Sequence, residues 1–213
     1  MACCIPTGVA GLSIEDSTGD PASPLYELPI AVERVRAARQ AIDRSGEDVL
    51  LTARAECYHV GHPDAFRESV RRLHAYAAAG ADVLFAPGPQ NPAEIKGLVD
   101  AVAPRPFNLL VVKDIGLDVG AITALGVRRI SVGGALALAA WTGFMEAARG
   151  LRSHGSFAGL ANLVPYSELN DLLDSIDRDS RVRGSEDDDW GRSECLDPDN
   201  VGDIADEGLG HRG

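Results

Sequence analysis

The feature that most constrains the fold is a regular alternation of short apolar runs and amphipathic segments between residues 8 and 173. Each apolar run is followed by a segment whose apolar residues recur at helical spacing. This rhythm is typical of repeated βα units around a parallel sheet. It fits an eight-stranded barrel and a doubly wound sheet equally well. The five expected strands are Gly8–Ile14, Val49–Ala53, Val83–Ala86, Phe107–Val112 and Val127–Val132.

Helix boundaries are marked by glycine, proline and a capping residue. Gly46 follows the first helical pattern at the position where a left-handed residue ends many helices. Asn91 stands where an N-cap is expected, with Pro92 at the first helical position. The expected helices are Pro29–Ser45, Pro63–Ala79, Asn91–Ala103, Asp118–Leu125, Ala135–Leu151 and Tyr166–Leu173.

Composition changes after Leu173, where acidic residues crowd among glycine and serine. So few apolar residues cannot offset the entropy of ordering the chain. We therefore predict one folded domain over residues 1–173 and a disordered acidic tail over residues 174–213. The tail could be a solvated extension or could bind a partner.

Charge and hydropathy narrow the class of protein. With 32 acidic and 20 basic residues the net charge is -12, which argues against a nucleic-acid partner. No run of about 18 apolar residues and no secretory leader is present, so we expect neither a membrane span nor export, and a cytoplasmic location. The four cysteines show no metal-binding spacing, and Cys57 fits a small packing residue.

Four sequence words carry a family resemblance. They are Gly11–Asp16 (GLSIED), Thr52–Glu56 (TARAE), Ala79–Phe85 (AGADVLF) and Leu125–Gly133 (LGVRRISVG). Together they resemble strands four, five, six and eight of the barrel of the isocitrate lyase and phosphoenolpyruvate mutase superfamily. The resemblance implies a partial (β/α)8 TIM barrel that holds about the last five βα units.

That family places three strands before the first of these words, where this chain has only Met1–Thr7. We therefore expect this chain to be a fragment, the product of a mis-started reading frame, or a half-barrel that another chain completes. The family's pair of metal-binding aspartates lies on one of those three strands and has no counterpart here. Metal affinity is accordingly expected to be impaired.

Barrel enzymes carry their working groups at the carboxyl ends of strands, and the residues expected there are Glu15, Asp16, Arg54, Glu56 and Asn108. The resemblance implies that Glu15 helps to hold Mg²⁺, usually through water. It also implies that Arg54 binds a substrate carboxylate through its guanidinium fork. The alternatives are that Glu15 and Asp16 are an ordinary pair of acids in a loop or at a helix start, and that Arg54 forms a structural ion pair with Glu56.

Further candidates carry weaker signals. Glu56 could orient Arg54 or a metal-bound water, and Asn108 could hydrogen-bond substrate oxygens. Backbone N–H groups at Gly133 could bind an anion, or the glycine could serve a tight turn. His59 and His62 have a metal-like spacing, but solvated loop histidines are the alternative.

The resemblance implies a magnesium-dependent lyase or mutase that breaks a C–C or P–C bond in a small 2-oxo or hydroxy acid. Isocitrate lyase activity is disfavoured, because Ser17–Pro24 lacks the catalytic cysteine of that loop, and Ala86 replaces a histidine of the phosphoenolpyruvate mutases. The alternative is a catalytically inactive fragment or interaction protein. Family members commonly form tetramers by exchanging the helix that corresponds to Ala135–Leu151, so a homo-oligomer is expected.

Overall fold

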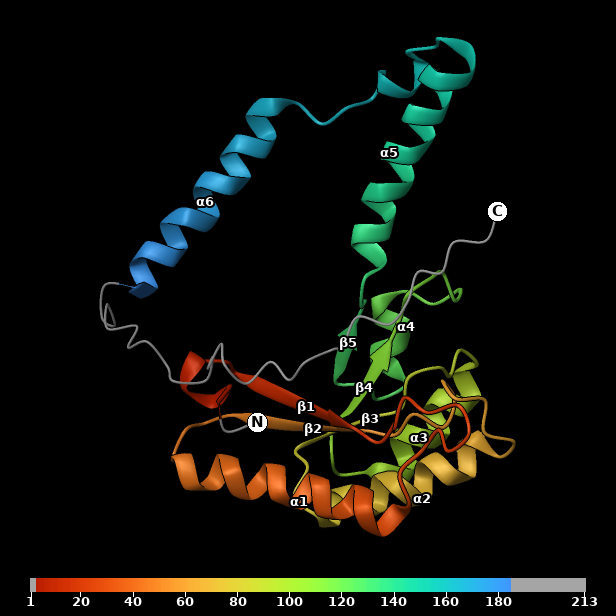
Figure 1. Ribbon diagram of the computed structural model, residues 1–213, viewed down its shortest axis with the longest axis vertical. Helices are drawn as coiled ribbons and strands as arrows, with labels where there is room; N and C mark the ends of the chain where they lie inside the picture. The colour runs from red at the N-terminus through yellow and green to blue at the C-terminus, as the bar shows by residue number, and fades with distance from the viewer. Residues whose placement is uncertain (1–2, 185–213) are drawn as a thin grey trace, which may run out of the picture. The chain divides into compact units, whose positions relative to one another are not determined.

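The computed structural model describes the backbone of residues 3–184 and the side chains of residues 3–175. Its sheet is wholly parallel, and the strand order β1-β2-β3-β4-β5 follows the chain (Figure 1). A doubly wound sheet reverses its strand order at a switch point, whereas a barrel does not. The sequential order therefore supports the expected partial, TIM-barrel-like α/β fold. The strands are β1 (Gly11–Glu15), β2 (Leu50–Arg54), β3 (Val83–Phe85), β4 (Phe107–Leu110) and β5 (Arg129–Ser131).

The helices follow the predicted order, and their boundaries differ from the prediction by at most three residues, except at the end of α6. Asn91 caps its helix as predicted, because its side chain accepts a hydrogen bond from the Ala93 N–H at 2.8 Å. The helices are α1 (Leu28–Ser45), α2 (Ala65–Ala78), α3 (Pro92–Val102), α4 (Val119–Ala124), α5 (Ala135–His154) and α6 (Tyr166–Gly184), with single 3-10 turns at Ile5–Thr7 and Ala158–Leu160.

The chain divides into two compact units, Met1–Leu160 and Ala161–Gly213. The second unit contains α6, which was predicted to end at Leu173 but continues to Gly184. The remainder of the predicted acidic tail, residues 185–213, lies outside the described residues. The domain boundary at residue 173 stays a prediction. No helix within the described part of the chain is long and apolar enough to cross a membrane.

The core lies between the sheet and helices α1 to α3, which cover one face of it (Figure 1). Residues alternate between the two faces along a strand. Leu51, Ala53, Leu84 and Leu109 are fully buried, and each belongs to the set that alternates away from Arg54 and its register partners. Cys57 is also fully buried, in agreement with its predicted packing role. Arg54 and its partners consequently lie on the opposite face, which is the inner face of a barrel.

Candidate functional site

One row of residues crosses the inner face near the carboxyl ends of the strands. Glu15 pairs in register with Arg54, and Arg54 with Phe85. Phe85 in turn pairs with Asn108, and Asn108 with Arg129. Register partners in a parallel sheet point to the same face, so the strands bring together three of the five predicted site residues.

Arg54 lies at the centre of the charged part of this row. Its guanidinium forms an ion pair with Glu56, and its Nε lies 3.4 Å from Glu15 Oε2. The guanidinium carbon also lies 5.1 Å from the centre of the Phe85 ring, a cation–π contact. The predicted Arg54–Glu56 pair therefore exists. With its side chain 28% exposed, Arg54 still has access to solvent and to a small anion.

Glu56 is a buried acid, with a side chain only 1% exposed. Burial raises its pKa above the ordinary value, because desolvation disfavours the carboxylate, and the nearby Arg54 only partly offsets this effect. Its Oε2 has no hydrogen-bonding partner among the described residues. A buried carboxylate oxygen without a donor is costly, so a ligand, water or cation at this oxygen would be favoured.

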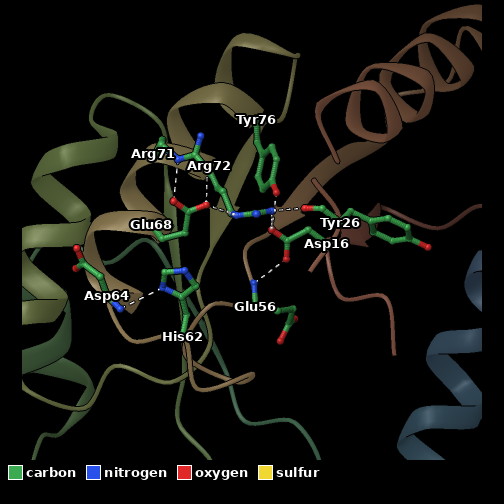
Figure 2. Close-up of polar contacts among 9 residues, drawn as sticks. All are labelled: Asp16, Tyr26, Glu56, His62, Asp64, Glu68, Arg71, Arg72 and Tyr76. Atoms are coloured by element: carbon green, nitrogen blue, oxygen red, sulfur yellow. Dashed lines mark hydrogen bonds and ion pairs between the residues drawn. The ribbon is translucent and has the colours of Figure 1, made fainter. Parts of the chain in front are cut away.

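A second buried acid, Asp16, follows Glu15 directly; it was expected at the strand end but was given no role in the site. Its side chain is 2% exposed and accepts three hydrogen bonds, from the Glu56 backbone N–H, Arg72 Nη1 and the Tyr76 hydroxyl (Figure 2). The first two measure 2.8 and 3.0 Å. The Asp16 N–H also donates to the Arg54 carbonyl at 3.2 Å. Asp16 therefore connects the ends of β1 and β2.

Arg72 extends this buried network to the helix layer and to the loop after β1. Its Nε donates to Glu68 at 2.8 Å, one helical turn away, and its Nη1 also donates to the Tyr26 carbonyl at 2.9 Å (Figure 2). The signal for this network was the four-residue spacing of Glu68, Arg72 and Tyr76, which places them on one face of a helix. The sequence does not reveal that Asp16 meets that face.

Asn108 is fully buried, and its amide groups have partners within the protein. Its Nδ2 donates to the Ser131 hydroxyl at 3.0 Å, and its Oδ1 accepts from Arg129 at 3.3 Å. To bind a substrate oxygen, Asn108 would have to exchange one of these contacts. Arg129 is an exposed cation in the same row that the sequence reasoning missed, although it lies in the LGVRRISVG word.

The remaining candidates lie in turns. Gly133 adopts a positive φ of 51°, which accounts for a glycine in the tight turn after β5. The His62 ring accepts a hydrogen bond from the Asp64 N–H at 3.1 Å, a local turn contact (Figure 2). Neither observation tests anion binding at Gly133, which stays a prediction.

The residues present fit part of a magnesium shell. Within the described residues there is no group of three histidine, cysteine or acidic side chains that could hold a metal. Mg²⁺, however, usually keeps several waters and binds proteins through only one or two carboxylates. Glu15, with a side chain 51% exposed, ends β1, and Glu56, with its unpartnered Oε2, follows the end of β2; both contact Arg54 and offer such a pair.

A parallel sheet in sequential order, with acids and an arginine at its strand ends, defines a barrel-type α/β protein with a candidate site for small anions. Residues 2–152 match the family described as phosphoenolpyruvate phosphomutase. The chain belongs to this family, as the resemblance predicted.

Similar proteins support the assignment. An uncharacterised protein of Mycobacterium tuberculosis is 31% identical over 173 residues, which cover 81% of this chain and 61% of that protein. A solved structure from Burkholderia cenocepacia is 40% identical, with a TM-score of 0.74, and the match covers 79% of this chain and 60% of that one. The chain thus spans about three fifths of the length of these relatives.

Among the similar solved structures, two examples with a named activity are informative. The structure of 2,3-dimethylmalate lyase, a member of the phosphoenolpyruvate mutase and isocitrate lyase superfamily, is 27% identical with a TM-score of 0.68, over 84% of this chain and 63% of that one. Oxaloacetate acetylhydrolase in complex with its product oxalate is 26% identical with a TM-score of 0.67, over the same shares. The superfamily therefore comprises lyases and mutases that act on small carboxylates.

Proposed function

We propose that this chain carries part of the active site of a magnesium-dependent lyase or mutase that acts on a small 2-oxo or hydroxy acid. The observation that supports the proposal is the cluster of Glu15, Arg54 and Glu56 at the ends of adjacent strands. Arginine at the centre suits a carboxylate substrate, because its planar fork can donate two parallel hydrogen bonds. The two acids suit a hard cation.

Each side chain has a distinct role in this proposal. Arg54 binds the substrate carboxylate and orients it, with Phe85 supporting the guanidinium from one side. Glu15 and Glu56 would hold Mg²⁺, partly through water. When bound, the ion supplies Lewis-acid stabilisation of the negative charge that develops as the C–C or P–C bond breaks. Asn108 and the turn at Gly133 lie near the same strand ends and would contact substrate oxygens.

The test is calorimetric titration of the purified chain with Mg²⁺ and oxalate, a stable mimic of an enolate. We expect binding that requires Mg²⁺ and that is reduced about a hundredfold or more in Arg54→Ala, because a bidentate charged contact is lost. Arg67→Ala is the matched control, since Arg67 is an exposed arginine of α2, 87% exposed and paired only with Asp64. Absence of binding, or equal binding by both variants, would contradict the proposal and favour an inactive fragment.

We also propose that the chain forms a homo-oligomer through α5. No residue of this helix is buried, and several large apolar side chains on it are more than half exposed. Exposed apolar surface of this kind usually marks an interface. Light scattering should report a mass above that of the monomer, and Trp141→Glu combined with Phe144→Glu should lower it. A wild-type chain that is monomeric at all concentrations would contradict the proposal. The exposed side chains are Leu136, Leu138, Trp141 and Phe144.

A further inference from the structure

A cavity of about 270 Å³ lies on the inner face of the sheet, nearer the amino ends of the strands than the row of site residues. Ser13 and Thr52 precede Glu15 and Arg54 by two positions and so point to the same face. Residues of β1 and of β5, the first and last strands in the sheet order, both line this cavity, so the sheet curves around it. Its lining includes Gly11, Ser13, Leu50, Thr52, Val83 and Arg129.

The side chains around this cavity are unusual for the inside of a barrel. Barrel interiors are normally filled by layers of bulky branched side chains. Here the row of register partners Ser13, Thr52 and Val83 contributes two hydroxyl groups, and Gly11 in the next row has no side chain. Within residues 3–175, neither hydroxyl group makes a hydrogen bond. Small and polar residues therefore leave a space beside two hydroxyl groups that can still bind a ligand.

Arg129 brings to the cavity a positive charge that no acid in the described part of the chain neutralises. Its side chain is exposed and forms no ion pair there, and its Nη1 donates only to Asn108 Oδ1 at 3.3 Å. None of the residues that line the cavity is acidic. Glu15, in the row nearer the carboxyl ends, already lies 3.4 Å from Arg54 Nε. A guanidinium without a counter-charge, next to free hydroxyl groups, favours an anionic ligand.

We propose that this cavity binds a small tetrahedral oxyanion such as inorganic phosphate. The guanidinium of Arg129 donates two parallel hydrogen bonds to two oxygens of the anion, a geometry for which its planar fork is suited. The hydroxyl groups of Ser13 and Thr52, on the strands at the other side of the cavity, donate to the remaining oxygens. A planar carboxylate has only two oxygens and could not use all of these donors. The site requires no Mg²⁺, and it does not rest on the proposed function.

Calorimetric titration of the purified chain with inorganic phosphate, in the presence of EDTA, tests the proposal. We expect binding that is weakened about tenfold or more in Arg129→Met, because a charged, bidentate contact is lost. Arg128→Met is the matched control. Arg128 is the preceding residue and is also exposed, but successive side chains of an extended segment point to opposite faces. This variant therefore changes the net charge equally and should keep the affinity of the wild-type chain.

A second variant keeps the test decisive if Arg129→Met fails to fold. Thr52→Val removes one hydroxyl group with little change in size, and it should weaken phosphate binding about two- to tenfold, as expected for one neutral hydrogen bond. Circular dichroism checks that each variant is folded.

Three results would overturn the proposal: no phosphate binding by the wild-type chain, equal affinities of Arg129→Met and Arg128→Met, or an unchanged affinity of Thr52→Val. Losses in Arg129→Met and Thr52→Val, but not in Arg128→Met, would confirm it. Because EDTA removes Mg²⁺, these results are independent of the Mg²⁺-dependent oxalate binding that tests the proposed function.

Discussion

Removal of the Asp16 carboxylate should destabilise the protein far more than removal of an exposed carboxylate. In Asp16→Ala, Arg72 stays in the protein with a side chain only 7% exposed, and the Glu56 N–H and the Tyr76 hydroxyl lose their acceptor. Breaking a buried ion pair from one side typically costs about 3–5 kcal/mol. Two unpaired buried donors, at about 1–3 kcal/mol each, give a similar total. We therefore expect the free energy of unfolding to fall by about 3–5 kcal/mol.

Urea unfolding followed by circular dichroism measures this change. Asp100→Ala is the matched control, because it breaks an exposed (i,i+4) pair with Lys96 that should be worth only about 0.3–0.5 kcal/mol. Arg72→Met alone should also be costly, since it leaves Asp16 charged and buried. The double variant should lose less than the sum of the two single variants, because each removes the same interaction.

The network would be refuted as a stabilising element if Asp16→Ala lost no more stability than Asp100→Ala. Additive losses in Asp16→Ala and Arg72→Met would refute the direct coupling between the two side chains. Asp16→Asn separates charge from shape, because the amide oxygen can still accept from the Glu56 N–H. We expect this variant to lose about 1.5–3 kcal/mol, the usual value of a hydrogen bond to a charged group.

Two further predictions follow from buried groups near the site. Burial raises the pKa of Glu56 above the ordinary value of about 4.3, so the folded state holds this proton to higher pH than the unfolded chain does. The free energy of unfolding should therefore decline as pH rises from that ordinary value through the pKa of the folded state. Urea titrations at several pH values should show a smaller decline for Glu56→Gln than for the wild-type chain. The same decline in both proteins would contradict this prediction. Gly88→Ala should lose about 1–3 kcal/mol more than Gly116→Ala in the same assay, because both glycines have positive φ but only Gly88 lies against Tyr58. Equal losses would show that the loops move apart easily.

The order of strands and helices could be predicted because it depends on local patterns. Each predicted strand is a short, mainly apolar run, and several helices carry their own start or stop signal, as at Asn91 and Gly46. Three strands were predicted to start one to three residues too early and three to end one or two residues too late, whereas β1 and β2 each extend one residue beyond the predicted end. The end of α6 was missed because the residues after Leu173 are polar, a composition that predicts disorder but is also compatible with an exposed helix.

The family motifs identify the fold more reliably than the site, because some of their residues serve packing and not ligand binding. In the AGADVLF word, Asp82 accepts from Arg39 at 2.9 Å and from the Leu51 N–H at 2.8 Å. Gly80 allows the Arg39 side chain to pack closely, since a Cβ there would lie 2.7 Å from it. The residues of this motif therefore serve the packing of α1 against the sheet and not the binding of a ligand. Asp16 was placed at the end of its strand, but its role in the buried network could not be predicted, because its partners lie 40 to 60 residues away in the sequence.

The position of Glu15 relative to Arg54 depends on more than the pairing of β1 with β2. In the described sheet β1 has a neighbour on one side only, so ladder hydrogen bonds hold it from a single edge. Asp16 adds contacts at the carboxyl end of β1, to Glu56 beyond β2 and to Arg72 on α2. Because these contacts lie one residue from Glu15 and two from Arg54, the separation of the two charged groups should be sensitive to the buried Asp16–Arg72 pair. A variant at Asp16 that still folds should thus weaken oxalate binding, although the proposed function assigns no ligand contact to Asp16.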